Sequence, residues 1–516
     1  MSNPHTAAPH TAAIPESFEM TTEVVDESVL ERTVERFRAN GIALPTFAQL
    51  RDPSTIPATV FEALAAVDKN GAHPLNLFRV HWFNQLDGSG PTEVPDHVEL
   101  PSELTGVDAR IVLAFGNRFP MIGAHKVLAA YACLVPRVIT GRFDPTANRA
   151  VWPSTGNYAR GGVAISRIMG CRGVAVLPEG MSRERFDWLD RWVEHPDDII
   201  RTPGTESNVK EIYDECGRLS QVPENVILNQ FSEMSNNLGH YQVTGPALAH
   251  VYEAVTANSG GTRLAAFVSA SGSAGTLGAG DFLKDEHGAR IVAVEALECP
   301  TLLYNGFGEH NIQGIGDKHV PLIHNVTNTD LVVAISDRAT DSLDVLFNNP
   351  AGRDHLVNRV GLAPELVDQL VHMGYSSICN TLAAIKTARH YRLTSDDVIV
   401  TVATDGSEMY NSERERVLER DFAGQFGAVE AAAVHAQYLE AVDTSDLREL
   451  DAVERDRLFN LGYFTWVEQQ GVALADFEIR RRQTFWDSLR PLTARWDELI
   501  GEFNARSGMV AGQPAP

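Results

Sequence analysis

The sequence is poor in cysteine. Only five occur among 516 residues, and they are Cys133, Cys171, Cys216, Cys299 and Cys379. They are scattered, odd in number and never spaced as C-x-x-C, so they predict neither a disulfide framework nor a zinc site. We therefore expect small core residues, no bound metal and a location in the reducing cytoplasm.

Positive charge and long apolar runs are also scarce. The chain has 43 Lys+Arg against 68 Asp+Glu, a formal net charge of −25 at pH 7. Such a surface repels nucleic acid and anionic membranes. No run of about 18 apolar residues occurs, and the first fifteen residues lack the basic and apolar regions of a signal peptide. We expect neither a nucleic-acid partner nor a membrane.

Three regions of the chain differ in pattern. Residues 1–72 are expected to form an N-terminal arm, disordered at 1–16. Residues 73–410 alternate strands with helices, which predicts an α/β core of two doubly wound parallel-sheet units. Residues 411–516 predict a helical extension with no strand after Tyr410 and a disordered end. The strands expected in the core are Pro74–Val80, Ala109–Ala114, Ala150–Trp152, Gly173–Leu177, Thr262–Ser269, Arg290–Glu295, Leu331–Ile335 and Asp397–Ala403.

Lys126 is the first candidate for chemistry. It stands at the start of an expected helix and is flanked by small and apolar residues. A lysine with few charged neighbours can be desolvated, which lowers its pKa and makes it a nucleophilic amine. The alternative is a solvated surface charge, the commoner role of a lone lysine.

A small polar turn follows the Ala150–Trp152 strand. It reads Ser154, Thr155, Gly156, Asn157 and opens a glycine-rich helix. Backbone N–H groups at such a turn are free to hold an anion. The turn and Lys126 together suggest an amine that captures a carbonyl beside a cradle for a carboxylate.

A second loop, Gly272–Thr276, also joins a strand to a helix. Its backbone N–H groups and the Ser273 and Thr276 hydroxyls can converge on a phosphate. It lacks a Walker A lysine and does not spell G-x-G-x-x-G, which argues against a nicotinamide-dependent oxidoreductase. A tight turn made for packing is the alternative. Ser376, at another helix start, is either an N-cap or a hydroxyl partner for a neutral ring nitrogen.

Ten short motifs follow one another between residues 73 and 410. They are Gly123–Lys126, Ser154–Asn157, Leu177–Ser182, Asn229–Ser232, Thr244–Pro246, Gly272–Thr276, Val292–Glu295, Ile312–Gly316, Gly374–Ser377 and Gly406–Tyr410. In this order they resemble the fold-type-II pyridoxal-phosphate enzymes, the group of cysteine synthase, cystathionine β-synthase and the tryptophan synthase β subunit. So many motifs in the family's order are hard to obtain by chance.

The resemblance implies a role for each candidate residue. Lys126 would hold pyridoxal 5'-phosphate as a Schiff base and later transfer a proton. Asn157 would hydrogen-bond the ring hydroxyl, and Ser376 would face the pyridine nitrogen. The implied phosphate-binding residues are Gly272, Ser273, Ala274, Gly275 and Thr276, and the implied carboxylate-binding residues are Ser154, Thr155, Gly156 and Gln230. The cofactor would supply the chemistry, and the protein would position and tune it.

Two departures from the family pattern stand out. The family's phosphate loop is usually G-T-G-G-T, and here Ser273 and Ala274 replace two of its members. After Asn157 the family usually has T-G, whereas this chain has Tyr158 and then Arg160 in the first turn of a helix. An arginine there opposes the helix dipole. We hypothesise that Tyr158 or Arg160 reads an acidic group on the substrate or nucleophile; the alternative is a surface arginine paired with a carboxylate.

The resemblance also implies an activity. A β-elimination or β-replacement on a small L-amino acid, passing through an aminoacrylate, is expected in the manner of cysteine synthase. The alternatives are a serine or threonine dehydratase, an ammonia-lyase on a specialised amino acid, or a non-catalytic binding relative, against which the retained Lys126 argues. Because the family commonly pairs, a homodimer is expected.

Overall fold

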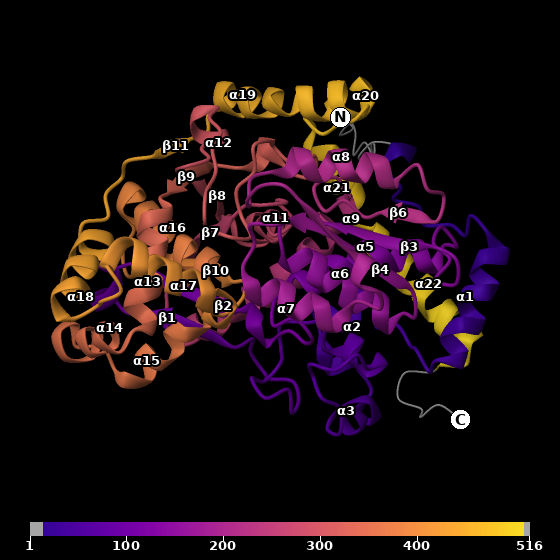
Figure 1. The fold of residues 1–516 in the computed structure, drawn as a ribbon, viewed down its shortest axis with the longest axis horizontal. Coiled ribbons are helices and arrows are strands. Elements are labelled where there is room, and N and C mark those ends of the chain that lie inside the picture. The colour runs from indigo at the N-terminus through magenta and orange to yellow at the C-terminus, as the bar shows by residue number, and fades with distance from the viewer. Residues whose placement is uncertain (1–13, 510–516) are drawn as a thin grey trace, which may run out of the picture.

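The computed structural model describes residues 14–509, so most of the two segments expected to be disordered lie outside the described part. Two β-sheets occupy different halves of the molecule (Figure 1). Helices cover both sheets, and the N-terminal arm and the C-terminal extension wrap the outside. The predicted α/β class with parallel sheets is confirmed.

The larger sheet has the strand order β1–β2–β10–β7–β8–β9–β11. Its five inner strands are parallel, and β1 and β11 are antiparallel edges. Neighbouring residues of β10 face opposite sides: Ile399 packs with helix α16 and Val400 with the cluster that contains helix α11. The strands are β1 His97–Leu100, β2 Arg110–Phe115, β7 Arg263–Ala270, β8 Arg290–Ala296, β9 Leu331–Ile335, β10 Asp397–Ala403 and β11 Leu447–Glu449.

The smaller sheet has the strand order β5–β4–β3–β6 and is parallel throughout. Val151 of β3 packs on helix α8, while its neighbour Trp152 belongs to the main core on the other face. Both faces are therefore covered, as parallel sheets require. The strands are β3 Arg149–Pro153, β4 Arg172–Pro178, β5 Ile199–Thr202 and β6 Asn225–Ile227.

The helices fall into three groups along the chain. The arm contains α1 Glu27–Ala39, α2 Phe47–Arg51 and α3 Ala58–Leu64. The core contains α4 Ser102–Thr105, α5 Lys126–Ile139, α6 Asn157–Ile168, α7 Arg183–Trp192, α8 Val209–Leu219, α9 Met234–Gly239, α10 Gly245–Thr256, α11 Leu277–His287, α12 Thr301–Tyr304, α13 Asp337–Asn348, α14 Pro350–His355, α15 Pro364–Gln369 and α16 Tyr375–Tyr391. The extension contains α17 Asn411–Phe422, α18 Ala428–His435, α19 Ala452–Tyr463, α20 Leu474–Ile479, α21 Gln483–Leu489 and α22 Leu492–Ser507. Within residues 14–509 no helix is both long and apolar enough to cross a membrane.

The segment at Pro74–Val80 and four strands differ from the sequence-based expectation, since β1, β5, β6 and β11 were not predicted. The segment predicted as a strand at Pro74–Val80 is a 3-10 helix, Pro74–Arg79, because Pro74 suits a helix start and the His73 side chain accepts the N–H of Leu75. The extension does contain a strand, since β11 pairs with β9 along the edge of the larger sheet. The three residues of β11 are half-exposed or exposed and form no apolar run, so the sequence did not indicate a strand there.

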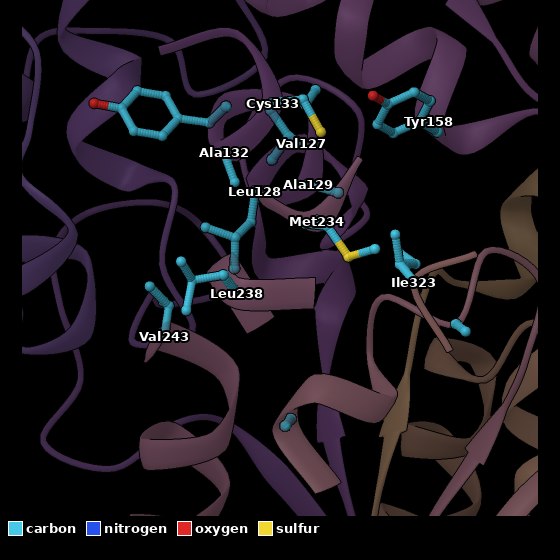
Figure 2. Packing of buried hydrophobic residues seen from close by; sticks show 14 of the residues in the cluster. Val127, Leu128, Ala129, Ala132, Cys133, Tyr158, Met234, Leu238, Val243 and Ile323 are labelled. Carbon is cyan, nitrogen blue, oxygen red and sulfur yellow. The ribbon is translucent and has the colours of Figure 1, made fainter. Parts of the chain in front are cut away.

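Helix α5 lies at the centre of the core and carries Lys126 at its first position. Every residue from Val127 to Ile139 is buried, as expected of a helix that is apolar on all sides. It packs against α6, α9 and α22, and Figure 2 shows Leu128 of α5 facing Leu238 of α9. The position of Lys126 is thus fixed by packing around the whole helix.

The arm and the extension meet on the outer side of α5. The Phe37 and Phe503 rings of α1 and α22 lie edge to face with centroids 5.1 Å apart. Asp497 of α22 accepts hydrogen bonds from the backbone N–H of Phe47 at 2.6 Å and of Ala48 at 3.0 Å, and so caps α2. The two ends of the chain therefore form one layer over the helix that bears the lysine.

Candidate active site

Strands of both sheets end at one pocket. Ser154 follows β3, Gln230 lies beyond β6, Gly272 follows β7 and Thr404 follows β10. Open α/β sheets bind ligands at the carboxyl ends of their strands, so this is where a site is expected. The pocket is lined by Lys126, Ser154, Thr155, Asn157, Tyr158, Gln230, Phe231, Gly272, Ser273, Gln313, Gly314, Ser376 and Thr404.

The pocket brings together nine of the fourteen residues predicted from the sequence. These are Lys126, Ser154, Thr155, Asn157, Tyr158, Gln230, Gly272, Ser273 and Ser376. The other five, Gly156, Arg160, Ala274, Gly275 and Thr276, adjoin the pocket without lining it. The individual roles assigned to these residues remain predictions.

Lys126 reaches into the pocket from the first turn of α5. Its Nζ lies 3.2 Å from Ser273 Oγ and 3.5 Å from Gln230 Oε1. Burial lowers the pKa of Lys126 to about 8, and the Asp317 carboxylate opposes that shift. About a tenth of the amine is therefore unprotonated at pH 7, far more than for an ordinary lysine, and the unprotonated form is the nucleophile.

The turn after β3 has the geometry of an anion cradle. The Gly156 N–H donates to Ser154 Oγ at 2.9 Å. Gly156 has φ 149°, and a Cβ on it would lie 2.7 Å from Nε of Arg185. Glycine is required here by the left-handed backbone and by the close approach of a cationic side chain. A buried cation beside the turn favours an anionic ligand.

Both the oxygen and the nitrogen of the Asn157 side-chain amide are hydrogen-bonded to charged side chains. Arg160 Nη1 donates to Asn157 Oδ1 at 2.8 Å, and Asn157 Nδ2 donates to Asp405 Oδ2 at 2.7 Å. Arg160 Nη2 donates to the carbonyl of Ile122 at 2.9 Å, and its guanidinium lies 5.0 Å from the centre of the Trp188 ring. Arg160 therefore fixes the orientation of Asn157 and leaves the second N–H of that amide for the pocket.

Asp405 and Arg185 belong to this network and were not found from the sequence. Asp405 accepts from Tyr410 OH at 3.0 Å and lies 3.5 Å from Arg185 Nη2, and both charged side chains are fully buried. Asp405 had a usable signal, because it comes two residues after the end of the buried strand β10. Arg185 had no such signal, because it lies in the first turn of helix α7 and only the fold brings it to Gly156.

The loop before α11 has the close backbone contacts of a phosphate cradle. A Cβ on Gly275 would lie 2.4 Å from Asn236 Oδ1, and a Cβ on Gly272 would lie 2.9 Å from the Gly314 carbonyl. Ala274, between them, has φ 67°, a left-handed conformation that costs a residue with a Cβ about 1–2 kcal/mol. Alanine thus occupies a position whose backbone suits glycine.

Comparison with known proteins agrees with this geometry. A family model described as "Pyridoxal-phosphate dependent enzyme" matches residues 87–343. This chain belongs to that family. The "Probable cysteine synthase" of Bacillus subtilis is 28% identical over 292 residues, covering 56% of this chain and 85% of that protein. Cystathionine beta-synthase of Saccharomyces cerevisiae is 24% identical over 386 residues, 71% of each chain.

Solved structures show the same fold. Cysteine synthase from Entamoeba histolytica has a TM-score of 0.52 at 20% identity, covering 67% of this chain and 92% of that chain. O-acetyl serine sulfhydrylase isoform 3 from the same organism has a TM-score of 0.51 at 22% identity, covering 67% and 93%. The protein is a pyridoxal-phosphate-dependent enzyme of fold type II.

The pocket residues fit pyridoxal phosphate. The buried amine of Lys126 suits an aldehyde, and the Gly272–Thr276 loop at the start of α11 offers backbone N–H groups to a phosphate. With the cofactor bound, the Asn157 amide and the Ser376 hydroxyl would be available for a ring hydroxyl and a ring nitrogen. A ring nitrogen that faced a hydroxyl, in place of a carboxylate, would stay largely unprotonated.

Ala274→Gly is expected to stabilise the protein. Glycine removes the left-handed strain, so the free energy of unfolding of the cofactor-free enzyme rises by about 1 kcal/mol, and the affinity for pyridoxal phosphate is kept or improved. The control is Ala279→Gly within α11, where glycine costs about 1 kcal/mol. Thermal unfolding and a cofactor titration measure both. An Ala274→Gly protein that melts earlier than wild type would contradict the assignment of strain.

Arg160→Met is expected to weaken cofactor binding without changing substrate preference. It removes the charged hydrogen bond to Asn157, worth about 1.5–3 kcal/mol, so the Kd for pyridoxal phosphate rises about 10-fold or more. Turnover of acidic and neutral amino acids should fall equally. Arg167→Met, an exposed change on the same helix, is the control. A loss confined to acidic substrates would instead support direct contact between Arg160 and the substrate.

Proposed function

We propose that the enzyme catalyses β-replacement or β-elimination on a small L-amino acid, in the manner of cysteine synthase. The observation that carries this proposal is one pocket that holds the Lys126 amine together with the Ser154–Asn157 turn and Gln230. The cysteine synthases and the cystathionine beta-synthase similar to this chain support it. A serine or threonine dehydratase, or an ammonia-lyase on a specialised amino acid, is the alternative outcome of the test below.

Each group of pocket residues has a separate role in the proposed reaction. The Ser154–Asn157 turn and Gln230 hold the substrate carboxylate and so orient its Cα–H bond toward Lys126. Lys126 Nζ accepts the Cα proton, which its lowered pKa suits at neutral pH. Bound pyridoxal phosphate supplies the electron sink for the pair left on Cα. The buried lining excludes water, which protects the reaction from wasteful hydrolysis.

Capture of the cofactor should depend on the protonation of Lys126. Only the free amine forms a Schiff base, so the rate of appearance of the visible absorption band should rise with pH and level off above about 8, where an ordinary lysine would level off above about 10.4. Stopped-flow absorbance of the cofactor-free enzyme measures this rate. Lys126→Ala should show no band, and an unchanged spectrum in that variant would overturn the Schiff-base assignment.

Product analysis with the loaded enzyme separates the activities. O-acetyl-L-serine with sulfide should give cysteine if the enzyme carries out replacement, whereas serine or threonine should give a 2-oxo acid and ammonia if it is a dehydratase. Lys126→Ala is the matched control for each reaction. Neither product from any of these amino acids would contradict the proposed function.

We also propose that the enzyme is a cytoplasmic homodimer. The five cysteines are buried free thiols. Three apolar side chains of α19, α20 and the segment between them, Val453, Phe464 and Leu474, are more than half exposed, and an apolar surface of this kind can meet another chain. Sedimentation should give twice the chain mass of 56.5 kDa, and Phe464→Ser should weaken the dimer. A single-chain mass at micromolar concentration would exclude the dimer.

A further inference from the structure

An outer hollow of about 490 Å³ lies between the start of helix α8, the loop after α12 and the extension (Figure 1). Small-molecule sites typically have volumes of about 300–1,000 Å³. The loop contributes Phe307, Lys318 and His319, and the extension contributes residues from Thr465 to Gln470. No residue of the hollow lines the substrate pocket. The hollow is therefore a second candidate binding site.

Phe307 is held at the rim of the hollow with its ring in water. At 80% it has the largest exposed fraction of any large apolar side chain in the described part of the chain. Its backbone is fixed on both sides, because Thr301 Oγ1 donates to the Gly306 carbonyl at 3.1 Å and Ser207 Oγ donates to the Gly308 carbonyl at 2.7 Å. A ring presented in this way offers its face to an aromatic ligand.

The charged groups of the hollow balance one another. Lys210 and Asp214 pair with each other one turn apart on α8. Lys318 is exposed and Glu211 is half-buried, and neither takes part in an ion pair within residues 14–509. One ammonium and one carboxylate are thus free to bind groups of opposite charge. A phosphorylated ligand would need a surplus of cations, which neither the hollow nor a chain of net charge −25 provides. A zwitterion matches this lining.

The extension supplies neutral hydrogen-bonding groups. The side chains of Thr465, Gln469 and Gln470 line the hollow and make no hydrogen bond to any other described residue. Amides and hydroxyls of this kind both donate and accept hydrogen bonds. The extension lies outside residues 87–343, which the family model matches. This side of the hollow is therefore built by a part of the chain that the family match does not include.

Four rings separate the hollow from the substrate pocket. Phe231 lines the pocket, and its ring lies 5.1 Å from that of His319 and 6.0 Å from that of Tyr213, both of which line the hollow. Trp466 of the extension lies 5.7 Å from His319 and 6.1 Å from Tyr213. Tyr213 OH is also 3.0 Å from His319 Nε2. A ligand in the hollow would lie beside the pocket without entering it.

We propose that the outer hollow is a binding site for a free aromatic α-amino acid, for which L-phenylalanine is the probe. The side chain of the ligand stacks on Phe307, its carboxylate pairs with Lys318 and its ammonium pairs with Glu211. The ligand is bound and not consumed. The site goes beyond the proposed function and does not depend on it, because binding in the hollow needs no turnover.

Titration calorimetry of the loaded enzyme tests the class of ligand. L-phenylalanine should bind at one site per chain with a Kd below about 1 mM. L-alanine carries the same charges without the ring, and 3-phenylpropionate and phenethylamine each lack one charge. Each of these three should bind about 10-fold more weakly or worse. Adenosine monophosphate should bind more weakly than L-phenylalanine, and the reverse order would overturn the proposal.

The visible absorption band of the bound cofactor reports where the ligand lies. During the same titration the band should keep its position, because the rings around Phe231 keep the ligand out of the substrate pocket. A band that shifted in step with the binding curve would place L-phenylalanine on the cofactor, and the hollow would lose its ligand.

Substitutions of exposed residues test the contacts without endangering the fold. Lys318→Met should raise the Kd for L-phenylalanine about 10-fold or more, since a charged hydrogen bond is lost. Phe307→Ala should raise it about 5-fold or more, whereas Phe307→Tyr, which keeps a ring, should stay within about 3-fold of wild type. Arg183→Met is the control, because Arg183 is an exposed cation of α7 that does not line the hollow. An unchanged Kd in both Lys318→Met and Phe307→Ala would refute the site.

A second copy of the chain is the other possible occupant of the rim. Sedimentation of Phe307→Ala should give the same mass as wild type, because the ring is proposed to meet a small ligand. A lower mass would assign Phe307 to a contact between chains and overturn the proposal. Failure of L-phenylalanine to bind would remove this site and leave the proposed function standing, whereas an enzyme that converts no amino acid would leave the binding measurements intact.

Discussion

The burial of the Lys126 amine is the constraint on which the rest of the structure depends. An ammonium is costly in an apolar surrounding, so the amine loses its proton more easily and becomes a nucleophile. That surrounding exists only because α5 is buried along its whole length. The arm and the extension, which meet through α1, α2 and α22, close the outer side of α5 and so belong to the active site indirectly.

The second requirement is that two separately built sheets hold one ligand. Asn157 starts α6 beside the smaller sheet, and Asp405 follows β10 of the larger sheet; a 2.7 Å hydrogen bond joins them. Arg160, Arg185 and Tyr410 complete a buried network around this bond. Buried charges are tolerated when they are paired and hydrogen-bonded. The network therefore holds the part of the pocket built on the smaller sheet against the part built on the larger sheet.

Lys126 and its acidic neighbours form a balanced set of charges. Glu206 and Asp317 raise the pKa of the lysine, and burial alone would lower it further. The lysine in turn lowers the pKa of Asp317. A proton moved within this set changes the charge of two groups at once and leaves the net charge of the set unchanged.

The local sequence pattern was enough to predict much of the fold. β10 lies where an apolar β-branched run predicted it, and α5 starts at the predicted Lys126, because periodicity and flanking small residues report local structure directly. The prediction of a strand at Pro74–Val80 was wrong because an apolar stretch does not distinguish a strand from a 3-10 helix. β11 was missed because an edge strand of three half-exposed residues carries no apolar run. The limits at residues 72 and 410 remain predictions.

The sequence by itself determined the α/β class, the family and the loops around Lys126, Asn157 and Gly272, because each depends on residues that are adjacent in the chain. Only the tertiary structure decided that Arg160 holds Asn157, that Asp405 and Arg185 join them, and that Glu206 and Asp317 come near enough to Lys126 to raise its pKa. These contacts join residues far apart in sequence, and they follow from how the two sheets pack. The pKa values of the site depend on burial and on hydrogen-bond geometry. Both arise only once the two sheets have packed together.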